Sequence, residues 1–466
     1  MPKIPAVSDP IRDQMAEEFA DSSGQLCVVH IIDRLVIGGP TNYAISLAAD
    51  LDPTKFHTHL IVGMPSHGES DRTDDAVQAG AAPLVITDLR REVGLHDLRA
   101  FIKILRALLR LKPDVVHTHK SKAGTLGRLA VPLYNWLTPS ALLFRPRRCK
   151  TVHTFHGHIF EGYFGSLKTR IFLEIERLLG RFCTDRIITI SLEQQKDIAD
   201  KYRVAKGEKV AVIPLAVEIN EQAIRPGALR SEFGISPTDI VIGIVGRLCE
   251  IKNFPLLLRA FAKARPLVSR DGRALRLVIV GDGHLRNELE ALARELSVEE
   301  HVAFTGFRED AAVLYCDFDF VALSSLNEGT PITLIEAMLH NLPLLATYVG
   351  GVPDLIGLPL YKTSSYDVWE HGITTRSNDV DAFSEAIRLL AEDSNLRARL
   401  GKTSRNFAIR CFSKEKLLTE TMNLYRKVAS PVNGAESRYG SSHWIRKISS
   451  DFSPKNQPQR RVDPSS

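Results

Sequence analysis

Two glutamates in the second half of the chain are spaced so that both could serve one ligand. Glu328 lies in the segment NEGTP at 327–331, which follows the apolar run FVALSS, and Glu336 comes eight positions later. Proline favours the first turn of a helix, and the free N–H groups of a helix start can hold an anion. One carboxylate could then bind sugar hydroxyls and the other a ribose diol. Two unrelated glutamates on an exposed helix are the alternative.

Two cations occupy a similar place earlier in the chain. Gly246-Arg247 ends the apolar run Ile240–Val245, and Lys252 stands just before the next helical pattern. A forked guanidinium and an ammonium beside a helix start are suited to a diphosphate. The alternative is a surface ion pair with Glu250, which lies between them.

Histidines and glycine-rich turns could indicate a metal site or a nucleotide site. Five of the 15 histidines lie near the ends of apolar runs, at 117, 119, 153, 156 and 158. No cysteine or carboxylate joins them closely in sequence, so we expect no metal site. Gly281-Asp282-Gly283 lacks the third glycine of a dinucleotide fingerprint, because position 286 is Arg; this argues against NAD.

These residues need a scaffold, and the hydrophobic pattern predicts one. Continuous apolar runs predict buried strands, and helical patterns separate them, which favours parallel sheets. Strands are expected at Leu26–Ile32, His59–Val62, Pro83–Ile86, Val115–His117, Lys150–Thr154, Arg186–Ile190, Val210–Ile213, Ile240–Val245, Leu275–Val280, Val302–Phe304, Phe318–Leu323 and Leu344–Thr347. Helices are expected at Thr41–Leu51, Leu98–Leu111, Leu167–Arg181, Phe254–Ala264, Leu285–Leu296 and Ser413–Val428.

A Pro- and Gly-rich break at 214–239 divides this pattern into two α/β domains, each a doubly wound parallel sheet. We expect a flexible lead-in at 1–24, an N-terminal domain at 25–220 and a C-terminal domain at 221–412. A helix at 413–429 should cross back to the first domain, and the polar tail at 430–466 should be disordered. Ligands of such sheets lie at the carboxyl ends of the strands, so the site is expected in the cleft between the domains.

The order of these motifs resembles that of retaining glycosyltransferases of family 4, which have the GT-B fold. The motifs are Gly246-Arg247 with Lys252, VIVGDG at 278–283, the pair Glu328 and Glu336, GGVPD at 350–354, Gly38-Gly39, DVVHTH at 114–119 and TFHG at 154–157. The resemblance spans residues 26–428. The segment HTFHGHIFEGYF at 153–164 is most similar to bacterial enzymes that build cell-surface polysaccharides.

The resemblance implies a role for each residue. Arg247 and Lys252 would neutralise the diphosphate of the donor, Glu336 would bind its ribose, and Glu328 would contact the donor sugar. The donor would also lie against the backbone of Gly329, Thr330 and Pro331 and of Gly38 and Gly39, where a side chain would collide with the leaving phosphate. His156 would lie at the reaction centre.

The implied reaction is hexosyl transfer with retention, from a nucleotide-diphosphate sugar to a lipid-linked or surface-polysaccharide acceptor. Positive groups at the diphosphate would lower the barrier, and no metal or other cofactor is expected. Asp317-Phe-Asp319 reads like the metal-binding DxD of other glycosyltransferases, but it enters a buried run and is expected to be structural. A sugar-nucleotide 2-epimerase of the same fold and a non-catalytic sugar-nucleotide-binding subunit remain as alternatives.

Composition indicates the class of protein and the cellular compartment that we expect. The chain has 466 residues, 44% hydrophobic and 25% charged, as in globular proteins. Its six cysteines are scattered, which is typical of reduced cytoplasmic thiols. Its start lacks the features of a secretory signal, so we expect a cytoplasmic protein. Residues 99–150 hold twelve Lys or Arg and one acid, Asp114.

Within this basic stretch, the segment 132–150 interrupts the family pattern with aromatic residues, leucines and arginines. Such a mixture suits an anionic membrane surface, at the inner face of the plasma membrane. Burial as a helix extension is the equally weighted alternative. Nucleic acid is not expected as a partner, because no aromatic RNA-binding motif is present. A second insertion, at 357–369, leaves the strand pairing there open.

Overall fold

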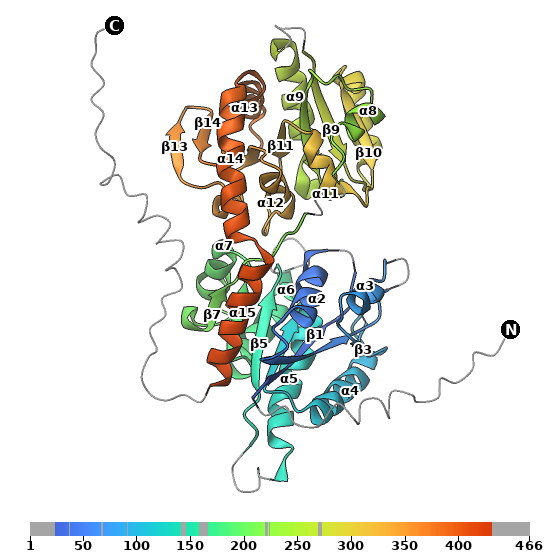
Figure 1. Cartoon of the computed structure of the whole chain (residues 1–466), viewed down its shortest axis with the longest axis vertical. Coiled ribbons are helices and arrows are strands. Elements are labelled where there is room, and N and C mark those ends of the chain that lie inside the picture. The colour runs from blue at the N-terminus through green and yellow to red at the C-terminus, as the bar shows by residue number, and fades with distance from the viewer. Residues whose placement is uncertain are drawn as a thin grey trace, which may run out of the picture. The chain divides into compact units, whose positions relative to one another are not determined.

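The computed structural model describes residues 24–430, apart from residues 37, 67–68, 91, 140, 142–145, 158–165, 220–221, 223 and 269–272. The predicted lead-in and tail lie outside the described residues. The strands form two open sheets, which are drawn in Figure 1. By contacts the chain divides into two compact units, residues 1–153 with 422–431 and residues 154–421 with 432–466, as far as these are described.

The first sheet has the strand order β3-β2-β1-β4-β5-β6-β7. β1 lies between β2 and β4, and its register with both is parallel. The strands are β1 (Leu26–Ile32), β2 (Phe56–Val62), β3 (Pro83–Val85), β4 (Val115–His119), β5 (Lys150–Phe155), β6 (Arg186–Thr189) and β7 (Val210–Val212). The helices are α2 (Gly39–Ala49), α3 (Thr73–Gln78), α4 (His96–Leu111), α5 (Ser121–Trp136), α6 (Ser166–Phe182) and α7 (Leu192–Lys196), with short turns η2 (Asp197–Lys201) and η3 (Gly207–Lys209).

The second sheet has the order β10-β9-β8-β11-β12-β15-β14-β13. Its strands are β8 (Ile240–Val245), β9 (Leu275–Val280), β10 (Val302–Gly306), β11 (Phe320–Leu323), β12 (Leu344–Thr347), β13 (Pro359–Lys362), β14 (Tyr366–Trp369) and β15 (Gly372–Thr375). The six strands β10, β9, β8, β11, β12 and β15, in this order across the sheet, pair in parallel. β13 and β14 form an antiparallel hairpin on β15. The insertion at 357–369 is therefore this hairpin.

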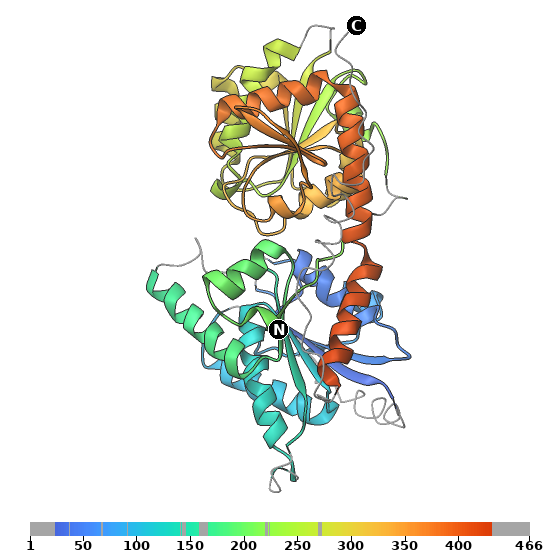
Figure 2. The same cartoon turned by 90° about the vertical axis from the view of Figure 1, so that its left-hand side faces the viewer.

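Helices pack on both faces of the second sheet, which is visible in Figure 2. The helices of this half of the chain are α8 (Ala228–Glu232), α9 (Phe254–Val268), α10 (Arg286–Glu295), α11 (Ala311–Leu314), α12 (Ile332–Leu339), α13 (Val380–Glu392) and α14 (Ser394–Cys411). The last helix, α15 (Lys414–Ala429), is grouped in part with the first unit. Short turns η5 (Glu250–Lys252), η7 (Glu299–His301), η8 (Tyr315–Asp317) and η9 (Val352–Asp354) lie among them. The predicted fold class, two Rossmann-like α/β domains with doubly wound parallel sheets, is confirmed.

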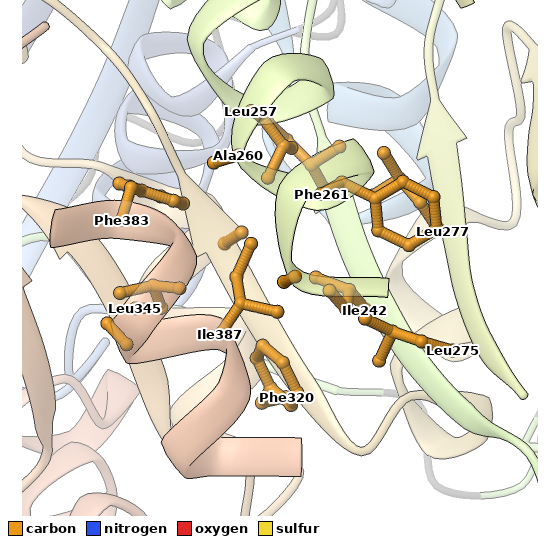
Figure 3. Close-up of a cluster of buried hydrophobic side chains, with 14 of the residues drawn as sticks. Ile242, Leu257, Ala260, Phe261, Leu275, Leu277, Phe320, Leu345, Phe383 and Ile387 are labelled. Carbon is orange, nitrogen blue, oxygen red and sulfur yellow. The ribbon is translucent and has the colours of Figure 1, made fainter. Parts of the chain in front are cut away.

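One face of the second sheet carries the core shown in Figure 3. Ile242 of β8, Leu277 of β9 and Phe320 of β11 lie beneath α9 and α13, and each is fully buried. Phe261 and Phe383 fill the space between the helices and the strands. Burying a side chain of this size stabilises a fold by about 1.5–3 kcal/mol, so this layer fixes the strands whose ends carry the predicted site residues.

The end of α15 belongs to the first unit, with Met422–Pro431 grouped beside β1–β4. Tyr425 is fully buried there, and its hydroxyl lies 2.5 Å from His117 Nδ1 on β4. Phe56 at the start of β2 meets the Tyr425 ring edge-on. The last described helix is thus joined to the first sheet through the buried phenol of Tyr425, and Arg426 also lies over the Phe56 ring, 5.5 Å from its centroid.

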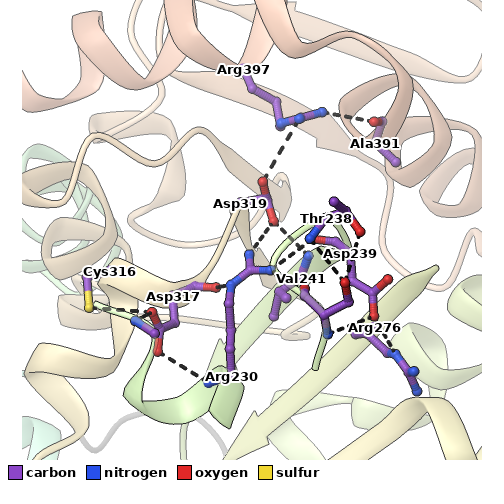
Figure 4. Close-up of polar contacts among 12 residues, drawn as sticks. Arg230, Thr238, Asp239, Val241, Arg276, Cys316, Asp317, Asp319, Ala391 and Arg397 are labelled. Carbon is purple, nitrogen blue, oxygen red and sulfur yellow. Dashed lines mark hydrogen bonds and ion pairs between the residues drawn. The ribbon is translucent and has the colours of Figure 1, made fainter. Parts of the chain in front are cut away.

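Asp317 and Asp319 have structural contacts, as the sequence suggested (Figure 4). Asp317 accepts hydrogen bonds from the backbone N–H groups of Gly227 and Leu229, at 2.5 and 2.8 Å. Asp319 accepts from the N–H of Val241 at 2.8 Å and pairs with Arg230 at 2.9 Å. Both carboxylates therefore fasten the segment around the start of β8 to the segment before β11, which begins at Phe320 rather than at the predicted Phe318.

Candidate active site

Lys252 and Glu328 meet at the carboxyl ends of two adjacent strands, β8 and β11. The loops after these strands are joined by backbone, since the N–H of Leu326 donates to the carbonyl of Ile251 at 2.8 Å. Ser324 Oγ donates to the carbonyl of Lys252 at 2.9 Å. Lys252 Nζ then lies 2.6 Å from Glu328 Oε1, with both side chains largely buried. The structure thus brings together two residues that the sequence predicted separately.

The Glu328 loop is held from two sides. Ser325 Oγ donates to Glu328 Oε1 at 2.5 Å. Behind the loop, Gly350 has φ +50°, and a Cβ there would lie 1.9 Å from the carbonyl oxygen of Glu328. A Cβ on Gly351 would lie 2.0 Å from the carbonyl oxygen of Gly329. Only glycine allows this approach, so the pair Gly350-Gly351 sets the position of the glutamate loop.

The glycines of the VIVGDG segment pack against the Arg247 loop in the same way. A Cβ on Gly281 would lie 2.0 Å from the carbonyl oxygen of Gly246, and one on Gly283 would lie 2.3 Å from that of Leu248. The N–H of Leu248 also donates to the carbonyl of Asp282 at 3.0 Å. These glycines therefore let two strand ends approach each other.

Arg247 and Thr330 present polar groups that the described residues leave open. Arg247 is exposed, and no ion pair or hydrogen bond joins its side chain to another residue in the described ranges. Thr330 Oγ1 is buried and has no hydrogen-bond partner among those residues. Thr330 precedes Pro331, which is the N-cap of α12. An exposed guanidinium and an unpaired hydroxyl at a helix start are what a bound anion would use.

Glu336 lies in the second turn of α12 and is not adjacent to any cation in the described residues. Its Oε2 accepts a hydrogen bond from the hydroxyl of Tyr315, at 2.7 Å. Burial raises the pKa of Glu336 above its usual range, and the Tyr315 hydrogen bond lowers that pKa. The Tyr315 pKa is itself raised well above normal by burial and by Glu336. Sequence reasoning missed Tyr315, because nothing in the pattern links it to position 336.

The first sheet places Gly38, Gly39 and His156 near its strand ends. Gly38 has φ +146° and caps the start of α2, which begins at Gly39. The N–H groups of Thr41 and Asn42 donate to the carbonyl of Gly38. His156 follows β5 directly and is partly exposed, and Gly157 has φ +158°. His158 and the rest of the segment to Phe164 lie outside the described residues.

The first sheet also carries a cluster of charged side chains that the sequence analysis did not predict. Asp33, which follows β1 and is nearly buried, lies 2.5 Å from Arg34 Nη1 and 3.1 Å from Lys120 Nζ. Arg34 pairs further with Glu69 at 2.8 Å. Lys120 follows β4 and has φ +61°, a conformation that side chains disfavour and that clusters at functional sites. Such a conformation cannot be read from residue types.

Three histidines gather beneath α15. His30 on β1 and His117 and His119 on β4 are fully buried, and their nearest ring nitrogens all lie within 4.8 Å of one another. His30 Nδ1 lies 3.2 Å from His119 Nε2, whereas His117 bonds Tyr425. Burial lowers the pKa of His30 to about 3. The set could ligate a metal by distance, but an ion would have to displace these hydrogen bonds. The absence of a metal stays a prediction.

Family models match both halves of the chain. Residues 37–221 match "Glycosyltransferase Family 4", and residues 227–407 match "Glycosyl transferases group 1". The two matched segments contain every strand of both sheets except β1, and they contain all the predicted site residues. The chain therefore belongs to the glycosyltransferases of the GT-B fold.

Curated relatives and solved structures agree with this assignment. A UDP-Gal:alpha-D-GlcNAc-diphosphoundecaprenol alpha-1,3-galactosyltransferase from Escherichia coli is 28% identical over 76% of this chain and 85% of its own length. The crystal structure of HepE from Anabaena in complex with UDP matches with a TM-score of 0.67 at 20% identity, over 86% of this chain and all of that one. A glycosyltransferase from Rickettsia africae matches with a TM-score of 0.68 at 15% identity, over 88% of this chain and all of that one.

Proposed function

We propose that this glycosyltransferase moves a hexose from a UDP-sugar to a lipid-linked saccharide, with retention of configuration. The observation that carries the proposal is the arrangement at the ends of β8 and β11, where Lys252 and Glu328 form a pair 2.6 Å apart beside the exposed Arg247. A cation, a carboxylate and an open guanidinium on adjacent loops can bind a phosphate, a sugar hydroxyl and a second phosphate together.

The donor is assigned to UDP because the E. coli relative is named for UDP-Gal and HepE was solved with UDP. In the proposed complex Arg247 and Lys252 neutralise the diphosphate and Glu336 accepts the ribose hydroxyls. Glu328 binds the sugar, the backbone of Gly329 and Thr330 supplies N–H groups, and Pro331, which has no N–H, starts the helix against which the donor lies.

Breaking the bond between sugar and phosphate leaves negative charge on the UDP. Cations fixed in advance at that position stabilise the transition state more than the bound donor, and so they raise kcat. Gly38 and Gly39 would allow the departing phosphate to approach the first sheet, and His156 would lie beside the reacting sugar. For retention without an enzyme nucleophile, a phosphate oxygen would take the acceptor proton on the face that the UDP leaves.

The acceptor is proposed to be a lipid-linked saccharide, the class named in the E. coli relative. Lipid-linked substrates place the reaction at a membrane, and we propose that the enzyme works at the inner face of the plasma membrane. No helix within the described residues is long and apolar enough to cross a bilayer.

The structure changes which residues of 132–150 can form the predicted membrane surface. Tyr134, one of the aromatic residues of this segment, follows the burial alternative rather than the membrane one: it is 2% exposed, and the Arg147 guanidinium lies over its ring at 4.6 Å. Arg147 also donates to the carbonyls of Tyr134 and Leu137 at 3.0 and 2.9 Å, so it fastens the following loop to the helix. Leu142–Phe144 and Arg145 lie outside the described residues.

An apolar stripe along α5 and its C-cap is a better candidate for the membrane surface than Tyr134. Leu129, Leu133, Trp136 and Leu137 are between 41% and 54% exposed and recur with helical spacing. The neighbouring helix α4 exposes further leucine and isoleucine together with its basic residues Arg99, Lys103, Arg106 and Arg110. Apolar side chains flanked by lysine and arginine are suited to an anionic lipid surface. The proposed membrane surface is therefore the stripe on α5 with the basic side of α4.

Donor binding tests the proposal. Purified protein is screened by thermal shift against UDP-, GDP-, ADP- and TDP-sugars, with Glu336→Ala as the control. A shift with UDP-sugars that the variant loses supports the site. The absence of a shift with every donor contradicts it.

Turnover separates the alternatives. UDP-galactose is incubated with and without a short-chain GlcNAc-diphospholipid, UDP release is followed, and the anomeric configuration of the product is read by NMR. Acceptor-dependent release with an α-linked product is expected. Epimerised sugar without acceptor would favour the 2-epimerase, binding without turnover would favour the non-catalytic subunit, and a trapped covalent glycosyl-enzyme would contradict the phosphate-assisted step.

A further inference from the structure

A buried tyrosine holds the glutamate that the proposed function assigns to ribose. Tyr315 lies in η8, before β11, and is fully buried. Its hydroxyl donates to Glu336 Oε2 at 2.7 Å, across 21 positions of sequence. This is the one hydrogen bond made by the Glu336 carboxylate within the described residues, so Oε1 stays available as an acceptor.

The tyrosine is itself held rigidly. The His340 ring stacks on it at 5.6 Å and 23°, and Phe318 meets it edge-on at 5.8 Å. His340 is fixed in turn, because its Nε2 lies 2.9 Å from the carbonyl oxygen of Ala312. Asp317, at the end of the same turn, anchors the backbone at 227 and 229. These contacts fix the position of the Tyr315 phenol oxygen without a contribution from a ligand.

Burial disfavours the ionised form of Glu336, which is the form that would bind the ribose hydroxyls best. A ribose diol offers O–H donors, which an ionised carboxylate accepts more strongly than a neutral acid does. Burial favours the neutral acid, and the Tyr315 hydrogen bond favours the anion. Of the elements packed on α12, α14 brings Arg405, which binds the carbonyl of Leu339, while β11 and β12 bring only uncharged side chains. His340 lies on α12 itself, one turn on.

We propose that Tyr315 is a positioning residue for nucleoside-diphosphate binding, which aims the Glu336 carboxylate at the ribose diol and keeps it ionised. The inference rests on the proposed function, because it takes Glu336 as the ribose ligand. It assigns recognition of the ribose to a pair of residues rather than to one glutamate. It also predicts that an intact 2′,3′-diol is part of what this site selects.

Calorimetry with UDP and 2′,3′-dideoxy-UDP tests the pair. Tyr315→Phe removes only the hydroxyl and should weaken UDP binding about tenfold, as expected when a charged hydrogen bond is lost. Binding of dideoxy-UDP should not change. Adding Tyr315→Phe to Glu336→Ala should cost nothing further. The matched control is Tyr361→Phe on β13, whose ring is 45% exposed.

The pH profile supplies a readout that a packing defect would not move. In Tyr315→Phe the pKa of Glu336 should rise. As the pH is lowered, UDP affinity should therefore begin to fall at a higher pH than in the wild type. Equal weakening of both nucleotides, or unchanged preference for UDP, would overturn the positioning role. If the wild type itself binds the two nucleotides equally, the ribose role of Glu336 fails instead.

Discussion

Lys252 and Glu328, 76 positions apart in the chain, form an ion pair 2.6 Å long at the ends of two neighbouring strands. Their side chains are only 20% and 10% exposed, so each partly compensates the cost of removing the other's charge from water. A donor diphosphate would compete with Glu328 for the ammonium. In the proposed complex, the pair would keep two oppositely charged ligands in place before the donor arrives.

Replacing Lys252 should separate its catalytic role from this structural one. Lys252→Ala should lower kcat by about 100-fold, with a smaller change in donor KM, because the charge it stabilises develops in the transition state. It should also lower Tm, since Glu328 is left without its partner. In Lys252→Ala/Glu328→Gln the Tm should recover while kcat stays low.

The matched control is Lys263→Ala, which breaks an exposed 2.6 Å pair with Asp381 in the same sheet's helix layer. Exposed pairs contribute about 0–1 kcal/mol, so both kcat and Tm should stay near wild type. A double variant that regains kcat would show that Lys252 serves only to neutralise Glu328. Arg247→Ala, in contrast, should lower kcat without the loss of Tm, because its side chain is exposed and unpaired in the described structure.

Replacing Glu336 should act on donor affinity instead. Glu336→Ala should raise donor KM by the equivalent of about 1–3 kcal/mol, the cost of a lost hydrogen bond to a charged group. The kcat at saturating donor should change less, since the ribose does not react. Steady-state kinetics over a range of UDP-sugar concentrations measure both. Wild-type KM in the variant would mean that the ribose lies elsewhere.

Removing metal ions should leave turnover unchanged. The cations proposed at the diphosphate are Arg247 and Lys252, so we expect no divalent ion there. Asp317 and Asp319 are engaged with backbone N–H groups and Arg230. Enzyme dialysed against EDTA should retain its kcat, and added Mg²⁺ or Mn²⁺ should not raise it. Metal analysis of the dialysed protein is the accompanying check. Loss of activity restored by one ion would contradict the metal-free mechanism.

Stability should fall in mildly acidic solution, because of His30. Its pKa is lowered by burial to about 3 in the folded chain, against 6.5 in the unfolded chain. The unfolded state therefore binds more protons below pH 6.5, and stability is lost progressively from there down to about pH 3. By pH 5 the loss from this residue should be about 2 kcal/mol.

Urea unfolding between pH 8 and pH 5 measures this dependence. His30→Gln should reduce the slope of unfolding free energy against pH, because the new side chain does not titrate. His284→Gln is the control and should leave the slope unchanged, since its ring is exposed beside Glu250. An unaltered slope in His30→Gln would show that His30 does not set the acid limit.

The α5 stripe should bind anionic membranes. Wild-type protein should float with vesicles of phosphatidylglycerol and phosphatidylcholine, and added salt should weaken that binding. Leu133→Ser/Trp136→Ser should reduce the partition constant by at least about tenfold, because each side chain loses apolar burial. Phe307→Ser, which removes a 61% exposed aromatic ring in the second half of the chain, is the control. Unchanged flotation in the double variant would exclude this surface.

The sequence determined the framework and the identity of most candidate ligands. A continuous apolar run is a local signal that can be recognised without knowing which segment pairs with it. The strands β1, β8, β9 and β12 therefore begin and end at the predicted residues. Glycine and charge at the ends of those runs marked Arg247, Lys252, Glu328 and Glu336, because strand ends in parallel sheets are where ligands bind. The insertion at 357–369 was visible in the sequence, but its pairing as a hairpin on β15 was not.

Tertiary structure alone decided how these residues are held. The Lys252–Glu328 pair, the Tyr315 bond to Glu336 and the His30–His119 contact each join segments 21 to 89 positions apart. The tertiary structure also determines that Tyr134 is buried and Trp136 is exposed. Two positions apart on one helix, they point in different directions, and only the packing of α5 on the sheet shows which is buried. Residue types determine which chemistry is available. The tertiary structure determines which groups come into contact and which pKa values shift.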